Sequence, residues 1–224
     1  MIELDKNAVQ NAQEWLDSTI DKEIKDEILR LKQEDINEFN DAFYKKLSFG
    51  TGGLRGIMGI GTNRMNSIVV ALSTQGFANY ILQQNPTEKE IKVAISFDSR
   101  NNSKDFAQIV AKVFAANGMK VFLFKEIHPT PLLSFAVREL GCNAGVMLTA
   151  SHNPKEYNGY KAYWSDGGQL VAPHDVNVIK EVEKITDISQ VKMQDNMNNI
   201  TLLGEDYDEI YYSKIANISL ATAH

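Results

Sequence analysis

The stretch from Ala144 to Pro154 decides the fold, and it reads AGVMLTASHNP. Its first five residues are apolar, and the residue before a proline is restricted to extended or turn conformations, so the stretch does not end as a helix. An apolar run that opens into a polar loop is typical of a buried strand in an open α/β sheet, which binds ligands beyond the carboxyl ends of its strands. We therefore expect a strand over residues 143–148 and an exposed loop that carries Ser151 and His152.

The segments on both sides of this strand alternate between strand-like and helix-like patterns. Apolar runs predict further strands, and apolar positions at intervals of three and four predict helices between them. The expected strands cover residues 91–97, 119–124 and 160–164, and the expected helices cover residues 67–84, 103–117 and 131–140. Ser67 and Ser103 are expected to cap the first two helices, and Gly141 to close the third. This alternation implies right-handed crossovers and an α/β fold, namely a three-layer α/β/α sandwich with a mixed, mostly parallel sheet.

The two ends of the chain depart from this alternation. Residues 7–47 are highly charged and carry apolar residues at intervals of three and four, so we expect a helical N-terminal arm packed on the α/β domain. The polar stretch 186–199 predicts a surface loop, and a further helix is expected from Asp206 onward. The acidic residues within 206–209 are interpreted as a helix start rather than as a metal site, because carboxylates interact favourably with the helix dipole there.

The composition limits the partners and the compartment of the protein. The chain has 224 residues, 43% of them hydrophobic, which is enough for one large domain with a substantial core. A net charge of −6 without a block of Lys and Arg predicts no nucleic-acid partner. No apolar run approaches the ~18 residues of a membrane span, and the N-terminus lacks a signal-peptide pattern, so we expect a cytoplasmic protein with no membrane partner. The one cysteine, Cys142, predicts a buried thiol rather than a disulfide.

Two well-known catalytic patterns are excluded by the residues that surround the polar motifs. A serine-hydrolase elbow needs Gly-x-Ser-x-Gly, but Thr149 and Asn153 stand where the glycines should be. The glycines of FGTGGLRG, residues 49–56, imitate a dinucleotide-binding fingerprint, which must follow a buried strand and open a helix. Here they follow the polar segment 45–48, so they instead predict a backbone that folds closely around an anion.

Four segments of the chain occur together in one order: FGTGGLRG (49–56), SFDSR (96–100), TASHNP (149–154) and NGYK (158–161). In this order they resemble the α-D-phosphohexomutases, the phosphoglucomutase and phosphomannomutase superfamily, over about residues 48–165. The resemblance implies an intramolecular phosphotransferase of the phosphoglucomutase type, which interconverts a sugar 1-phosphate and a sugar 6-phosphate. It also implies a phosphoserine and a bisphosphorylated sugar as intermediates, which is a form of covalent nucleophilic catalysis.

The resemblance assigns catalytic roles to Ser151, His152, Lys161 and Arg55. Ser151 would carry the phosphoryl group, and His152 would move a proton to or from it, unless the imidazole only caps the loop. Lys161 would hold a phosphoryl oxygen or act as an acid or base. Arg55 would clamp the phosphoserine, because a guanidinium meets phosphate oxygens in a bidentate fork.

A second group of residues is expected to bind or support the ligand. The resemblance implies that Thr51 and Asn153 contact the substrate phosphate, although Gly52 stands where muscle-type phosphoglucomutases carry a serine. Asp98 and Arg100 end a buried strand close to this site, where a charge usually needs a partner. We interpret them as support behind the site, with direct contact to the ligand as the alternative.

The resemblance also implies the cofactors. Mg²⁺ would bind one oxygen of phosphorylated Ser151, which is therefore the one metal-site residue expected in this chain, and carboxylates of another domain would complete the site. Glucose 1,6-bisphosphate is expected as the primer that phosphorylates the serine, and a phosphosugar is the expected substrate.

Members of this superfamily have four domains, and the chain corresponds to the first. We expect the helical arm at 1–47, domain I at 48–204, and the start of a linker or helix toward a second domain at 205–224. The remaining domains of a longer parent chain are then partners, and the chain alone is expected to be inactive. A phosphomannomutase or a phosphopentomutase is the alternative within the superfamily, and a non-catalytic phosphate-binding or regulatory module is the alternative outside it.

Overall fold

A single sheet organises the residues that the computed structural model describes, which are 3–50, 52–193 and 198–218. Its strands are β1 (Gly53–Ile57), β2 (Lys92–Phe97), β3 (Lys120–Phe124), β4 (Ala144–Leu148), β5 (Tyr157–Trp164) and β6 (Ile200–Leu203). They lie side by side in the order β1-β5-β4-β2-β3-β6. β2 is parallel to β3 and β4, β3 is parallel to β6, and β5 is antiparallel to β1 and β4. The sheet is therefore mixed and mostly parallel, as the sequence predicts.

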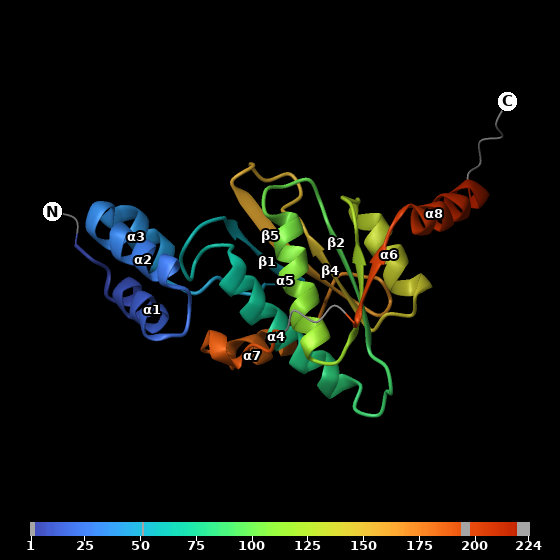
Figure 1. Ribbon diagram of the computed structural model, residues 1–224, viewed down its shortest axis with the longest axis horizontal. Coiled ribbons are helices and arrows are strands. Elements are labelled where there is room, and N and C mark those ends of the chain that lie inside the picture. Colours follow the sequence, from blue (N-terminus) through green and yellow to red (C-terminus); the bar gives the residue numbers. More distant parts are fainter. Residues whose placement is uncertain (1–2, 51, 194–197, 219–224) are drawn as a thin grey trace.

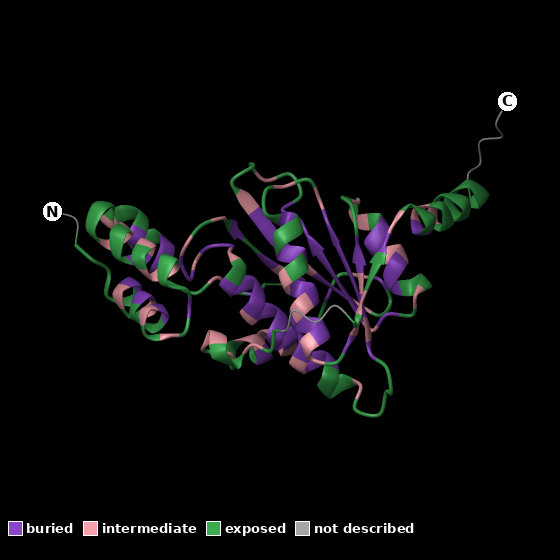
Figure 2. Ribbon diagram, viewed as in Figure 1, coloured by how far each residue is buried: buried purple, intermediate pink, exposed green. Residues whose placement is uncertain are grey.

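Helices cover both faces of this sheet (Figure 1). The helices are α1 (Lys6–Asp17), α2 (Lys22–Glu34), α3 (Ile36–Phe43), α4 (Ser67–Gln84), α5 (Ser103–Ala116), α6 (Thr130–Glu139), α7 (His174–Glu183) and α8 (Glu205–Ile218), with a 3-10 turn η1 (Ile188–Gln190). Buried side chains of α4 and α5 pack on one face of the sheet, and those of α6 pack on the other. The buried residues concentrate between these layers (Figure 2), so the expected three-layer α/β/α sandwich is confirmed.

Strands β2 and β4 end at the same level of the sheet, and this alignment positions the serine loop. All five residues of β4 are buried, because α5 and α6 cover its opposite faces. Phe97 at the end of β2 lies opposite Leu148 at the end of β4, and the amide of Asp98 donates to the Leu148 carbonyl at 3.1 Å. The polar segments after the two strands therefore leave the sheet at the same edge and side by side, which is where parallel strands present their ligand sites.

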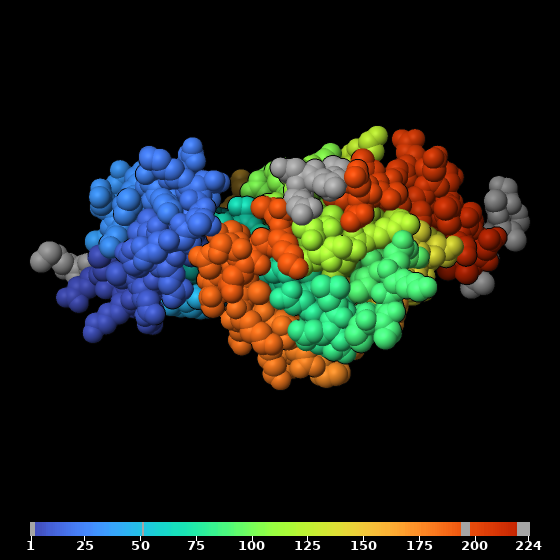
Figure 3. Space-filling view, turned by 60° about the horizontal axis from the view of Figure 1, so that its bottom comes forward, coloured from blue at the N-terminus to red at the C-terminus, as the bar shows by residue number. Residues whose placement is uncertain are grey.

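The helical N-terminal arm forms a lobe at one end of the molecule, opposite the C-terminal segment (Figure 3). Its core includes Trp15 and Phe43, whose rings meet edge to face with centroids 5.8 Å apart. Arg64, only 3% exposed, ties the arm to the segment that follows β1. Its guanidinium contacts the carboxylates of Glu38 at 2.9 Å and Asp41 at 2.6 Å. These contacts fix the arm beside the segment that follows β1.

Several elements differ from the expectations drawn from the sequence. The glycine-rich segment contains strand β1, because its backbone pairs with β5 from Gly53 to Ile57 in spite of the low strand propensity of glycine. β5 begins at Tyr157, three residues earlier than expected, and neither α7 nor β6 was expected. The 186–199 stretch contains the turn η1, and residues 194–197 lie outside the described part.

The helix caps also differ in detail. The cap of α4 is Asn66 rather than Ser67, and its side chain accepts the amide of Val69 at 2.9 Å. Asn102 precedes α5 in the left-handed conformation, so Ser103 is the first residue of the helix and not its cap. Asparagine adopts this backbone conformation more readily than other non-glycine residues, which explains the shift by one residue. The predicted close of α6 at Gly141 is confirmed by its φ of 61°.

The thiol of Cys142 is buried, as the sequence predicts. Cys142 is 2% exposed, and its burial raises the pKa of the thiol to about 12. At neutral pH the side chain is therefore a small apolar group and not a thiolate nucleophile. Within the described residues, no helix combines the length and the apolar character that a membrane crossing requires.

Candidate active site

Ser151 occupies the exposed loop that follows β4, where the sequence places it. Its backbone is left-handed, with φ at 56°, a conformation that non-glycine residues adopt at a cost of about 1–2 kcal/mol. The amide of Ser151 donates to the hydroxyl of Thr149 at 2.9 Å, and the amide of Asn153 donates to the Ala150 carbonyl at 3.1 Å. A strained residue persists only where its surroundings determine it, so this loop is held in place from outside.

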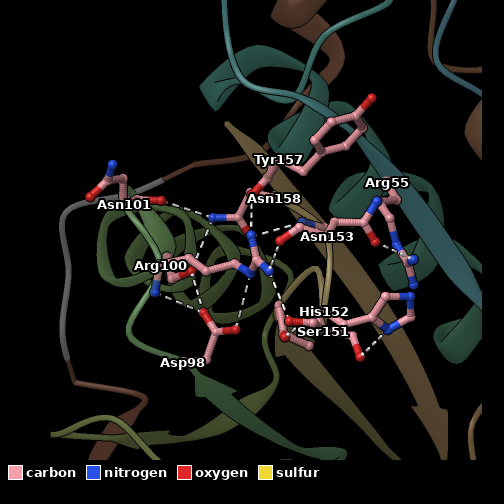
Figure 4. Close-up of polar contacts among 12 residues, drawn as sticks. Arg55, Asp98, Arg100, Asn101, Ser151, His152, Asn153, Tyr157 and Asn158 are labelled. Carbon is pink, nitrogen blue, oxygen red and sulfur yellow. Dashed lines mark hydrogen bonds and ion pairs between the residues drawn. The ribbon is translucent and has the colours of Figure 1, made fainter. Parts of the chain in front are cut away.

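His152 lies directly beside the hydroxyl of Ser151. Its Nδ1 is 3.3 Å from the Ser151 Oγ, and both side chains are exposed (Figure 4). At this separation the imidazole can take the hydroxyl proton as Oγ attacks and return it later. The structure therefore brings together the two residues that the sequence selects for proton and phosphoryl transfer.

Arg55 reaches the serine loop from β1. Its Nη1 donates to the Asn153 Oδ1 at 2.7 Å, and the side chain is exposed. Figure 4 shows Arg55 approaching the loop from one side, next to His152, while Arg100 approaches from the other. Within the described residues the guanidinium has no other hydrogen bond or ion pair. It therefore keeps donors free for an anion on Ser151.

Lys161 lies on the same face of the sheet as Arg55. In the β1–β5 pairing Arg55 is opposite Gly159 and Gly53 is opposite Lys161, and residues two apart on a strand share one face. Lys161 is also opposite Met147 of β4. The side chain makes no hydrogen bond or ion pair with any described residue, so its ammonium group is available to a ligand near the carboxyl end of β4.

The segment before β1 is only partly described. Thr51 lies outside the described residues. The carbonyl of its neighbour Gly52 accepts the amide of Ala162 at 2.8 Å and the side chain of Gln169 at 3.2 Å. Gly159 allows β5 to approach the serine strand, since a Cβ on it would lie 2.6 Å from the carbonyl oxygen of Thr149.

Asp98 and Arg100 lie behind the serine loop. The Asp98 Oδ1 accepts the backbone amide of Arg100 at 3.0 Å, and the Arg100 Nε lies 3.6 Å from the Asp98 Oδ2. The Arg100 guanidinium points into the loop and contacts its backbone carbonyls (Figure 4). Both charges thus have partners inside the protein.

An open hollow of about 360 Å³ adjoins Ser151. It is lined by Asp98, Ser99, Arg100, Asn101, Ser151, Asn153 and Lys155. Ser99, Asn101 and Lys155 were not selected from the sequence, although Ser99 lies inside the SFDSR motif and the other two directly follow a motif. A more apolar pocket of about 260 Å³ lies between α1, α4 and α7, but its lining contains no histidine or cysteine beside a hydroxyl group. The chemistry therefore favours the hollow at Ser151.

The described residues do not form a magnesium site. Among them, no group of three or more His, Cys, Asp or Glu side chains is arranged to hold a metal ion. The acidic residues Glu205, Asp206 and Asp208 occupy the first turn of α8, so the interpretation of this segment as a helix start is confirmed. The described residues thus do not fit a complete Mg²⁺ site.

The fold and its serine loop define an α/β/α domain that exposes the Ser151 hydroxyl at the carboxyl ends of its parallel strands. A family model for the phosphoglucomutase/phosphomannomutase α/β/α domain I matches residues 46–189. The chain therefore belongs to the phosphoglucomutase/phosphomannomutase family, as the resemblance of its motifs predicts.

Known proteins share most of the described domain. A human phosphopentomutase is 42% identical over 153 residues, which are 66% of this chain and 25% of that protein. A phosphoglucomutase of Staphylococcus aureus is 40% identical over 174 residues, 77% of this chain and 30% of its own length. The crystal structure of a candidate phosphomannomutase from Thermus thermophilus matches 79% of this chain and 37% of its own, with a TM-score of 0.62 and 28% identity. The chain thus spans about a quarter to a third of the relatives it matches.

The left-handed backbone of Ser151 predicts an unusual order of stabilities. Ser151→Gly should leave the free energy of unfolding within about 1 kcal/mol of the parent value, because glycine adopts positive φ without steric cost. Ser151→Val should lower it by roughly 1–3 kcal/mol, since a β-branched residue is poorly tolerated there. Urea unfolding followed by circular dichroism measures both.

The matched control is Ser99, an exposed serine of the neighbouring loop that is not among the residues with positive φ. Ser99→Gly and Ser99→Val should differ much less than the two Ser151 variants. Equal stability of Ser151→Gly and Ser151→Val would contradict the left-handed conformation.

Proposed function

We propose that the chain is the catalytic-serine domain of a phosphosugar mutase of the phosphoglucomutase type, and that Ser151 accepts and returns the phosphoryl group. One observation carries the proposal. The Ser151 hydroxyl is exposed on a strained turn at the carboxyl end of β4, with the His152 imidazole 3.3 Å away and Arg55 beside the loop. Nucleophiles activated by an adjacent base occupy such positions.

The chemistry consists of two transfers in opposite directions. The Ser151 Oγ attacks the phosphorus of a sugar bisphosphate, a new O–P bond forms, and the bond from phosphorus to the sugar oxygen breaks. His152 takes the hydroxyl proton, and the departing sugar oxygen receives a proton. In the reverse direction, phosphoserine gives its phosphoryl group to the other hydroxyl of a bound sugar monophosphate. The net result is an isomerisation of sugar 1-phosphate to sugar 6-phosphate, and phosphate is not consumed.

Arg55 and Lys161 supply the positive charge for this transfer. In-line phosphoryl transfer depends on positioning and on cations that stabilise the equatorial oxygens. Arg55 would exchange its bond to Asn153 for a bidentate contact with the phosphoserine, which frees the Asn153 amide for the substrate phosphate. Lys161 would hold a phosphoryl oxygen or move a proton, and Thr51 would add a hydroxyl contact.

The cofactors and the other domains belong to the same proposal. Mg²⁺ would be held by an oxygen of phosphorylated Ser151 and by carboxylates from outside this chain. The ion would neutralise charge on the phosphoryl group. Glucose 1,6-bisphosphate would serve as the primer. We assign the arm to 1–47, domain I to 48–204, and a linker toward further domains of a cytoplasmic parent chain to 205–224, of which 219–224 lie outside the described residues.

The substrate is proposed to be glucose phosphate. The relatives named above include a phosphopentomutase and a phosphoglucomutase with nearly equal identity, so a pentose phosphate is the closest alternative and a mannose phosphate the next. The alternative of another class is a phosphate-binding or regulatory module that never forms a covalent intermediate. Transfer of phosphate to Ser151 separates this module from the enzyme.

Covalent phosphorylation is the first test. The chain, incubated with millimolar α-D-glucose 1,6-bisphosphate and Mg²⁺, should slowly gain about 80 Da, the mass of one phosphoryl group bound to a serine oxygen. Peptide mapping by mass spectrometry should place the group on Ser151. Ser151→Ala should gain none and should fold normally, because an exposed loop hydroxyl contributes little to stability. Phosphate that appears on other residues, or on none after prolonged incubation, would contradict the proposed enzyme.

Turnover is the second test. The chain alone should convert glucose 1-phosphate to glucose 6-phosphate at no measurable rate, because the described residues provide no metal site and transfer depends on electrostatic stabilisation. A coupled dehydrogenase assay with glucose 1,6-bisphosphate as primer measures this rate. Sustained turnover by the chain would show that it holds the whole catalytic site.

A further inference from the structure

The terminal N–H groups of the Arg100 guanidinium all donate to backbone carbonyls of the serine loop and its continuation into β5. Its Nη1 donates to the carbonyls of Pro154 at 2.8 Å and Tyr157 at 3.0 Å, and its Nη2 donates to those of Ser151 at 2.8 Å and Asn153 at 2.5 Å. A guanidinium has two N–H groups on each terminal nitrogen, so these contacts occupy all of them. Its Nε faces Asp98, and the side chain is 13% exposed. Arg100 therefore has no donor left for a phosphate.

Arg100 is in turn fixed by a buried polar chain that begins on β5. The Asn158 Nδ2, on a fully buried side chain, donates to the Ser103 Oγ at 3.0 Å and to the Asn101 carbonyl at 2.9 Å. The Ser103 hydroxyl donates to the Asp98 Oδ1 at 3.0 Å, and the same oxygen accepts the amide of Arg100. The Asn158 Oδ1 accepts the amide that follows it at 2.7 Å, so this side chain is fully paired. Figure 4 shows Asn158 and Arg100 side by side behind the loop.

We propose that Asn158 and Arg100 are positioning residues that hold Ser151 in its left-handed conformation before any ligand binds. The carbonyl oxygen of Ser151 is drawn toward Arg100, while its hydroxyl lies beside His152. Charge-assisted hydrogen bonds to several carbonyls of one loop offset the cost of the strained residue. The consequence for phosphoryl transfer rests on the proposed function, whereas the hold on the loop does not.

The two arginines of the site thus have separate tasks. Arg55 makes one hydrogen bond to the loop and remains exposed, so it is free to bind the phosphoryl group. Arg100 contacts only the backbone and Asp98, and it acts on the reaction through the shape of the loop. Loss of Arg55 should therefore weaken ligand binding, and loss of Arg100 should slow the transfer step.

Amide hydrogen exchange tests the hold on the loop directly. Arg100→Lys leaves three donors for the loop carbonyls, and Asn158→Ala removes the buried anchor. Both variants should speed exchange in peptides covering 149–157 by at least tenfold, while exchange in β2 stays unchanged and shows that the fold is intact. Arg138→Lys is the matched control, because Arg138 also donates to a backbone carbonyl, that of Ser134, but lies on α6. Unchanged exchange of the loop in both variants would overturn the proposal.

The concentration dependence of Ser151 phosphorylation by glucose 1,6-bisphosphate provides the second readout. Arg100→Lys should lower the maximal rate at least tenfold and leave the half-saturating concentration within about twofold, whereas Arg55→Lys should raise that concentration about tenfold. A rise of the half-saturating concentration in Arg100→Lys, with an unchanged maximal rate, would overturn the positioning role. An unaltered chain that is never phosphorylated would count against the proposed function alone, since the exchange measurement still decides the hold on the loop.

Discussion

The contact between Arg100 and the carbonyls of the serine loop is the interaction on which the rest of the site depends. It joins the segment after β2 to the segment after β4, and it is possible because the two strands end at the same level. A loop of this length would otherwise sample many conformations, and ordering each residue costs about 1–2 kcal/mol of backbone entropy. The Arg100 guanidinium holds the loop backbone in one conformation without a ligand, so Ser151 is presented in one orientation.

The charge distribution around Ser151 contrasts with that of the whole chain. The net charge is −6, yet Arg55, Lys155 and Lys161 carry cations near the loop without acidic partners among the described residues. The carboxylate of Asp98 is paired with Arg100. Free cations at a loop with an exposed hydroxyl suit a phosphorylated ligand, because their attraction for phosphate is not already satisfied inside the protein. This local pattern, and not the total charge, supports the phosphorylated substrate that we propose.

Much of the fold could be predicted from the sequence because its periodicity is strong. The apolar run before Ser151 and the helical periodicity between the strands predicted the sandwich correctly, although the expected caps Ser67 and Ser103 were wrong. β1 could not be predicted, since its residues become a strand only through pairing with β5. The motifs identified Ser151, His152 and Arg55, which the structure brings together, but not the buried role of Asn158. Its contacts span 55 positions in the chain and leave no local pattern.

On this proposal the protein itself fixes Ser151 before any ligand binds. The most direct measurement is the backbone φ of Ser151 in the free chain in solution, from three-bond scalar couplings and backbone chemical shifts in an NMR spectrum. We predict a single conformation with positive φ, as in the structure at 56°, with sharp signals for the loop. A negative φ, or couplings averaged between extended and left-handed conformations, would contradict it.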